Sequence, residues 1–277
     1  MYSIQVFSST EQAFLVNSFI IETKNGLVLV DTQFLTSSTR ELVRVISERG
    51  RPLLGVVITH PHPDHFNGAA EIEQHWPTVP IYATQTTIDV IRATEAQKRL
   101  AWAPVYGDDY PPRTTLPTHV VSTGEPLIID GLVLMLDDLG AGESEDITVV
   151  YLPQTRALIA SDLVYHRVHP WLAEGRTKQW LQQIAVVRSR YASASAVYAG
   201  HGQSGALELL SEQADYLLEF REQVRSTVKD LNSPSKEERE QIANQFRQRY
   251  AGYPLEMLVD MNVEGVAREL AAEMVVA

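Results

Sequence analysis

The chain of 277 residues predicts an α/β protein. Short apolar runs rich in β-branched residues alternate with longer segments of helical periodicity. Apolar residues make up 44% of the chain, which is enough for a sizeable core. Four of the apolar runs stop at a histidine or an aspartate, so strand ends would gather polar side chains at one edge of a sheet.

The predicted elements follow one another in a strand–helix rhythm. Residues 13–31 predict two strands joined by a turn at Asn25-Gly26, which is a strong hairpin signal. A helix is expected over 37–49, with Ser37 as its cap and Gly50 at its end. The next apolar run, 53–59, is typical of a buried strand. Farther along we expect helices over 67–76, 84–99 and 177–191, and strands over 80–83, 118–137 and 147–160.

The C-terminal part of the chain has a different pattern. Residues 205–231 carry apolar positions at helical spacing among many charges, and Ser233-Pro234 is typical of a helix start. We therefore predict an α/β domain over 1–205 and a helical extension over 206–277 that packs on it. This extension has three possible roles: it packs on the main domain and does nothing more, it mediates dimerisation, or it forms a wall of the substrate pocket.

Residues 59–65, Thr-His-Pro-His-Pro-Asp-His, form the most informative motif. Each imidazole offers a neutral nitrogen to a metal such as zinc. The two prolines are expected to keep the backbone extended, so that side chains two positions apart share a face. We therefore expect two neighbouring metals, the first held by His60 and His62 and the second by Asp64 and His65.

Three more strand ends agree with this placement. Apolar runs stop directly before Asp31, Asp162 and His201, as another does before His60. A polar residue at one strand exit is common, but four exits that all supply metal-binding groups are much less so. We expect these residues to meet in one pocket.

The pattern His-x-His-x-Asp-His after a hydrophobic strand resembles the signature of the metallo-β-lactamase fold superfamily. The resemblance covers about residues 13–205. It implies a four-layer αββα sandwich with a dinuclear metal site at one edge. That superfamily includes β-lactamases, glyoxalase II enzymes, lactonases, alkylsulfatases and RNA-processing nucleases.

The resemblance also implies roles for single residues. His60 and His62 match ligands of the first metal, whereas Asp64, His65 and His201 match ligands of the second. Asp162 matches the carboxylate that bridges both ions. Asp31 matches an acid that orients a ligand imidazole.

One position departs from the family pattern Gly-His-Ser-x-Asp. The matching stretch is Gly-Glu-Ser-Glu-Asp over 142–146, so Glu143 stands where the third first-metal histidine is usual. Alkylsulfatases also use glutamate there, and two histidines with a glutamate form an accepted zinc site. The oxygen ligand favours manganese or iron more than usual, after zinc. Alternatively, Glu143 does not bind and the site holds one metal or none; Glu145 is a weaker substitute.

Composition excludes several classes of site and partner. The chain has no cysteine, so disulfides and thiolate ligands are absent. A net charge of −12 disfavours nucleic acid, and no apolar run reaches the roughly twenty residues of a membrane span. The N-terminus lacks the pattern of a signal peptide, so we expect a cytoplasmic protein that acts on a small molecule, with homodimerisation as an open alternative.

Two segments are candidates for substrate contacts. They are 101–117 and 165–171, both rich in aromatic residues. The alternative is that these side chains only pack the loops down, and His166 is expected to be an ordinary loop histidine. The candidate substrate-binding residues are Trp102, Tyr106, His169 and Trp171.

The resemblance implies hydrolysis by a metal-bridging hydroxide, with Asp64 as a ligand that also accepts a proton. An ester, lactone or amide of a small organic substrate is the first expectation. The alternatives are a sulfate- or phosphate-ester hydrolase, a diiron redox protein, and a binding protein poor in metal.

Overall fold

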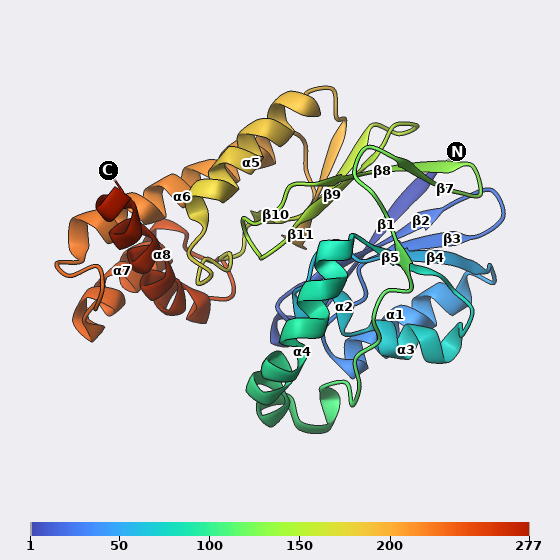
Figure 1. Ribbon diagram of the computed structural model, residues 1–277, viewed down its shortest axis with the longest axis horizontal. Coiled ribbons are helices and arrows are strands. Elements are labelled where there is room, and N and C mark those ends of the chain that lie inside the picture. Colours follow the sequence, from blue (N-terminus) through green and yellow to red (C-terminus); the bar gives the residue numbers. More distant parts are fainter. Residues whose placement is uncertain (1, 277) are drawn as a thin grey trace.

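A computed structural model describes residues 2–276 of the chain. Two β-sheets lie face to face, and helices cover the outer face of each sheet (Figure 1). The strand order is β1-β2-β3-β4-β5-β6 in the first sheet and β11-β10-β9-β8-β7 in the second. The predicted four-layer αββα sandwich is confirmed.

The first sheet and its helices come from the N-terminal half of the chain. Its strands are β1 (Ser3–Ser8), β2 (Asn17–Glu22), β3 (Leu27–Val30), β4 (Leu53–Val57), β5 (Ile81–Ala83) and β6 (His119–Val120). Its helices are α1 (Thr36–Glu48), α2 (Pro63–Phe66), α3 (Ala69–His75) and α4 (Gln85–Tyr106), with short 3-10 turns η1 (Glu11–Ala13) and η2 (Gly107–Asp109).

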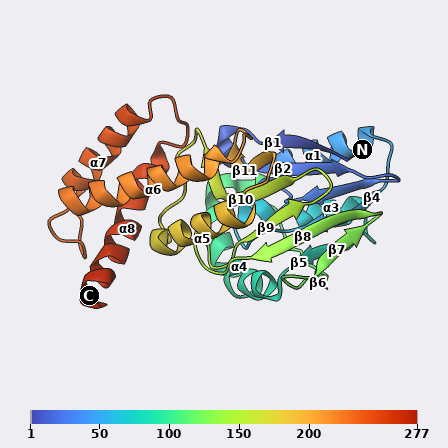
Figure 2. The same ribbon diagram turned by 90° about the horizontal axis from the view of Figure 1, so that it is seen from above.

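The second sheet follows, and the C-terminal helices extend beyond one end of the sandwich (Figure 2). Its strands are β7 (Pro126–Ile129), β8 (Leu132–Asp138), β9 (Thr148–Leu152), β10 (Ala157–His166) and β11 (Ala196–Gly202). Its helices are α5 (Thr177–Arg190), α6 (Glu208–Thr227), α7 (Lys236–Arg249) and α8 (Met257–Val276). The boundary expected at 205 falls between β11 and α6.

Alternation along the strands divides the core into layers. In β2 and β3, Phe19 and Val30 point toward the second sheet, whereas Ile20 and Leu29 point toward the cluster that contains α1 and α3. Successive strand residues point to opposite faces, so both faces of these strands are apolar and buried. This burial on two sides holds the strand ends rigidly at the edge where the polar residues gather.

The N-terminal hairpin is confirmed, since β2 and β3 pair antiparallel around residues 23–26. The helix after it begins at Thr36, and Ser37 is not its cap. The Ser37 side chain instead donates a hydrogen bond to Asp109 at 2.7 Å. Gly50 does lie just beyond this helix in a left-handed conformation (φ +61°), as predicted.

Other local predictions were wrong. Pro63 does not prevent a helix but begins α2, because proline lacks the N–H that stays unpaired at the first helical position. Strand β1 has no counterpart among the predictions, and α4 runs to Tyr106, so residues 101–106 are helical. Ser235 rather than Ser233 caps α7, in a capping box with Glu238.

Candidate metal centre

Seven predicted metal ligands meet at one edge of the sandwich. They come from the segment after β4, from α2, from the β8–β9 loop, and from β10 and β11. They form two neighbouring groups of potential ligand atoms. The first group contains His60, His62, Glu143 and Asp162, and the second contains Asp64, His65 and His201.

In the first group, ligand atoms lie at the separations expected around one ion. The distance from His62 Nδ1 to Glu143 Oε2 is 3.3 Å, and that from His60 Nε2 to Asp162 Oδ2 is 3.5 Å. Donors bound tetrahedrally at about 2.1 Å from zinc lie about 3.4 Å apart. Glu143 therefore lies where a ligand of this group is needed.

Asp162 also belongs geometrically to the second group. Its Oδ1 lies 3.2 Å from His65 Nε2, and its Oδ2 lies 3.2 Å from His201 Nε2. The same carboxylate thus faces histidines of both groups, which is the placement a bridging ligand requires. Asp64 closes the second group, with Oδ2 at 3.3 Å from His201 Nε2.

The donor set fits two divalent ions. Within residues 2–276, no hydrogen-bond partner faces the buried Nε2 atoms of His60, His65 and His201. The same holds for Glu143 Oε2 and Asp162 Oδ1. Buried polar atoms without partners are costly, and metal ions would satisfy all of these at once.

Hydrogen bonds on the other ring nitrogens set the orientation of the histidines. Nδ1 of His65 lies 2.8 Å from Asp31 Oδ2, and Nδ1 of His201 donates to the backbone oxygen of Phe14 at 2.7 Å. Nδ1 of His60 lies 3.0 Å from the hydroxyl of Thr59. Each contact favours the tautomer whose Nε2 lone pair faces the site.

Asp31 is fully buried and turns out of β3 with a left-handed backbone (φ +62°). Its second oxygen accepts a hydrogen bond from the backbone N–H of Thr59 at 2.9 Å. Asp31 is therefore held from two sides while it contacts His65. This is the orienting position that the family resemblance implied.

Burial and mutual charge shift the pKa values of these groups. Burial lowers the pKa of His60 to about 4, so this imidazole is neutral. Burial also acts against protonated His201, but the carboxylates of Asp162 and Asp64 raise its pKa to about 9. Burial, with the charge of Asp162, raises the pKa of Glu143 well above its usual range. Without metal the acids and histidines share protons, which bound cations would replace.

Tyr165 begins the segment 165–171 that was a candidate for substrate contacts, but the sequence patterns did not predict that it contacts the ligands. Its hydroxyl lies within hydrogen-bond distance of Asp162 Oδ2 (2.7 Å) and Glu143 Oε1 (2.9 Å). Its ring stacks on His201, with centroids 4.6 Å apart and planes 2° from parallel. Tyr165 thus touches ligands of both groups.

An irregularity in β10 explains why Asp162 and Tyr165 face the same site. Ser161 pairs with Ala199 and Tyr165 pairs with His201, so four steps along β10 match two along β11. The strand therefore continues past Asp162, contrary to the predicted strand end. Gly200 makes room for this arrangement, because a Cβ there would lie 1.9 Å from Asp162 Oδ1.

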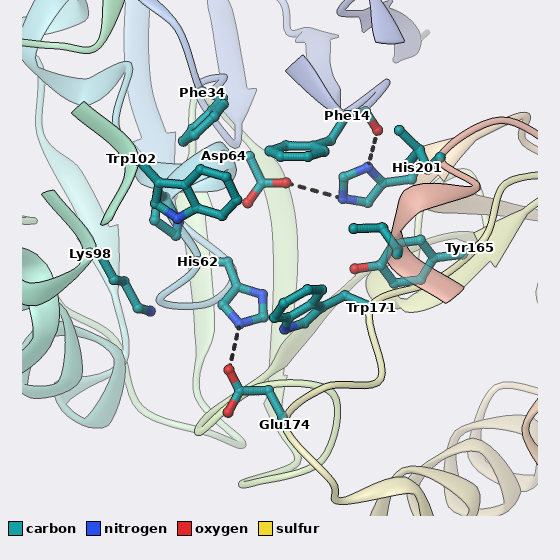
Figure 3. A pocket seen from close by; sticks show the side chains of 13 residues that line it. Phe14, Phe34, His62, Asp64, Lys98, Trp102, Tyr165, Trp171, Glu174 and His201 are labelled. Carbon is teal, nitrogen blue, oxygen red and sulfur yellow. Dashed lines mark hydrogen bonds and ion pairs between the residues drawn. The ribbon is translucent and has the colours of Figure 1, made fainter. Parts of the chain in front are cut away.

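A pocket of about 210 Å³ opens beside the centre (Figure 3). Trp102 and Trp171, two of the candidate substrate-binding residues, line it. Tyr106 packs behind this wall on Phe34, and its hydroxyl donates to the backbone oxygen of Gln12. His169 lies elsewhere, fully buried with Nδ1 2.8 Å from the Tyr216 hydroxyl. The pocket is lined by Phe14, Phe34, His62, Pro63, Asp64, Lys98, Trp102, Tyr165, Trp171, Glu174, His201, Leu255 and Leu258.

The layered fold and the buried cluster of histidines and carboxylates define a metal-dependent hydrolase. The model of the metallo-beta-lactamase superfamily matches residues 12–220. The chain belongs to this superfamily, whose hydrolases carry dinuclear metal centres. Among the helices of residues 2–276, none combines the length and the apolar character that crossing a membrane requires.

Individual relatives agree with the family match. A metallo-beta-lactamase type 2 of Pseudomonas aeruginosa is 23% identical, covering 78% of this chain and 83% of its own. The type 2 enzyme of Bacillus cereus is 27% identical, covering 73% and 72%. The solved metallo-beta-lactamase from Pontibacter korlensis superimposes with a TM-score of 0.63 at 26% identity, covering 78% and 94%. A ribonuclease J of Pyrococcus abyssi also matches, over 52% of this chain and 32% of its own.

Proposed function

We propose that the protein hydrolyses an ester, lactone or amide of a small organic substrate, with two divalent ions held by the seven ligands. The observation that carries this proposal is the set of unpartnered, inward-facing atoms on His60, His65, His201, Glu143 and Asp162. Zinc suits the histidine-rich donor set best. Manganese and iron are the alternatives because three carboxylates take part.

Bound ions of this kind polarise a carbonyl oxygen and lower the pKa of water. The chain supplies the rest. Tyr165 and the residues on the outer ring nitrogens hold the ligands in place. Asp64 reaches the pocket, with 14% of its side chain exposed, whereas Asp162 is only 1% exposed. Asp64 is therefore the acid best placed to accept a proton beside a bound substrate.

Charge supports a small-molecule substrate over nucleic acid. The net charge is −12, and phosphate backbones are bound through clustered lysine and arginine. The pocket is lined by only one such residue, Lys98, among the described residues. RNA cleavage, sulfate-ester hydrolysis and diiron redox chemistry are therefore alternative outcomes of the test below.

The test combines metal analysis with a substrate panel. We expect about two zinc or manganese ions per chain and hydrolysis of at least one ester, lactone or amide. The panel also contains β-lactams, sulfate esters and RNA. His65→Ala should lower this activity at least about hundredfold. His75→Ala is the matched control, because His75 is half-exposed on α3, and it should keep wild-type activity. Two irons with visible absorbance and no hydrolysis of any compound in the panel, or no uptake of metal on titration, would reject the proposal.

A further inference from the structure

The C-terminal extension contributes directly to the pocket beside the metal centre. The family match ends at residue 220, so residues 221–277 lie beyond it. Two residues from this part, Leu255 and Leu258, nevertheless line the pocket together with ligands His62, Asp64 and His201. The pocket of this chain is thus not complete without its C-terminal helices.

The turn before α8 is tied to the N-terminal side of the pocket. Leu255 is fully buried and has a left-handed backbone (φ +66°), which is unusual for a side chain of this size. Its N–H donates to Glu11 Oε1 at 3.3 Å. Glu11 begins η1, which ends directly before Phe14, another lining residue. Two walls from opposite ends of the chain are therefore joined.

Helix α8 also holds the loop that carries Trp171. The buried side chain of Asn262 accepts from the N–H of Leu172 at 2.7 Å and donates to the backbone oxygen of Pro170 at 2.8 Å. These two hydrogen bonds bracket Trp171. One turn farther on, Gly265 allows close contact, because a Cβ there would lie 2.4 Å from the backbone oxygen of Ala173.

The opposite wall is aromatic. Phe14, Phe34 and Trp102 form a mutual cluster, with ring centroids 5.4 to 5.8 Å apart. Figure 3 shows these rings around Asp64 on one side of the pocket and Trp171 beside His62 on the other. The pocket between these walls has a volume of about 210 Å³. A short acyl chain or a single ring therefore fits between apolar walls.

Lys98, the lysine that lines the pocket, already contacts other groups of the protein. Lys98 Nζ donates to the backbone oxygen of Pro61 at 2.7 Å, and the carboxylates of Glu145 and Glu174 act on the same ammonium group. Glu174 also lines the pocket, and its carboxylate faces His62 Nε2 at 3.8 Å. An anionic substrate group in this pocket would lie near the Glu174 carboxylate, so an uncharged group is favoured.

We infer that the C-terminal extension is the specificity element of this enzyme, and that Leu255 and Leu258 select substrates whose acyl side is uncharged and apolar. The inference rests on the proposed hydrolase function. It deepens that function by naming the substrate class: neutral esters or lactones with a short alkyl or aryl acyl group.

Substitutions at Leu258 test the inference on a series of p-nitrophenyl esters from acetate to decanoate. Leu258→Ala enlarges the pocket, so the preferred acyl chain should lengthen, and kcat/KM for the wild-type optimum should fall about tenfold. Leu258→Phe should shift the preference toward shorter chains. Leu270→Ala is the matched control, because Leu270 is also buried on α8 but does not line the pocket. It should keep the wild-type profile.

A binding measurement separates this inference from the proposed function. Straight-chain alcohols, followed by tryptophan fluorescence, should bind the wild-type protein about fourfold more tightly per added methylene until the pocket is full. Leu258→Ala should move that limit to a longer chain. If no ester, lactone or amide is hydrolysed while alcohols still bind this way, the proposed function fails. If esters are hydrolysed but Leu258→Ala and Leu270→Ala share the wild-type profile, or if anionic substrates are preferred, the inference is overturned.

Discussion

The hydroxyl of Tyr165 lies 2.7 Å from Oδ2 of Asp162, the carboxylate that faces both groups of metal ligands. The same hydroxyl reaches Glu143, and it has one proton to share between the two acids. Tyr165 therefore couples the position of Glu143 to that of Asp162.

Replacing Tyr165 by phenylalanine should weaken metal binding about tenfold, because partners that hold ligand carboxylates typically contribute that much. Competition with a chromophoric chelator measures this change. Tyr198→Phe is the control, since Tyr198 lies on β11 and packs on Phe19 outside the ligand set. Equal metal affinities in the two variants would mean that the Tyr165 hydroxyl does not support the centre.

Glu143 and Glu145 offer a direct test of the unusual ligand. Glu143 Oε2 faces His60 and His62, whereas Glu145 belongs to a separate cluster with His62 and Glu174. Glu143→Ala should lose about one metal equivalent by elemental analysis and most of the activity. Glu145→Ala should keep both metals. Glu143→His should bind zinc at least as tightly as the wild type. Retention of full metal and activity in Glu143→Ala would refute the ligand assignment.

Asp31 should act on one group of ligands more than on the other. Asp31→Asn removes the charge beside His65 Nδ1 and leaves His62 untouched. We expect a 10- to 100-fold loss of affinity for the ion of the group that contains His65, with the other ion retained. Calorimetric titration of the metal-free protein resolves the two events. A parallel loss of both ions would show that Asp31 supports the whole edge of the sheet rather than His65.

His169 should influence stability in acid rather than catalysis. Burial, together with the charge of Arg247, lowers the pKa of His169 to about 4 from its ordinary 6.5. As the pH falls below about 6.5, His169 is protonated in the unfolded chain but stays neutral in the folded protein. The free energy of unfolding therefore decreases between pH 6.5 and 4. His169→Gln should make that decline shallower by about 2 kcal/mol, after allowance for solvent screening.

Urea unfolding at several pH values measures this change in slope. His75→Gln serves as the control, because His75 is half-exposed and should leave the wild-type slope unchanged. At pH 8, kcat/KM of both His75→Gln and His169→Gln should stay near the wild-type value. An unchanged slope in His169→Gln would place the acid sensitivity in other groups.

Local patterns were enough to propose the ligand motif, because residues 60–65 are close in sequence and their chemistry is visible at once. The N-terminal hairpin was equally local, since its turn residues determine it. Asp162 and His201 are distant in sequence, and the strand-end pattern predicted that they share a pocket with His60. Only the family resemblance assigned Glu143 to the same site.

Tyr165 lay outside what periodicity can predict. A regular strand would place residue 164, not 165, on the same face as Asp162. Ser161 has a left-handed backbone (φ +48°) at the irregularity in β10, and Val164 is fully buried in the helical layer. Nothing in the residue types marks such a break. The sequence patterns also could not predict that Phe14 and Leu258 line the pocket. Their positions depend on how the two ends of the chain meet.

The C-terminal helices and the second sheet share one hydrophobic cluster that runs from Val149 on β9 through Leu210 and Phe220 on α6 to Leu270 on α8. Moving these helices aside as a lid would expose this shared hydrophobic cluster to solvent. Substrate therefore enters a cavity whose shape is set before the substrate binds. We therefore expect substrate selection to depend on the shape of this preformed pocket rather than on a hinge motion of the helices.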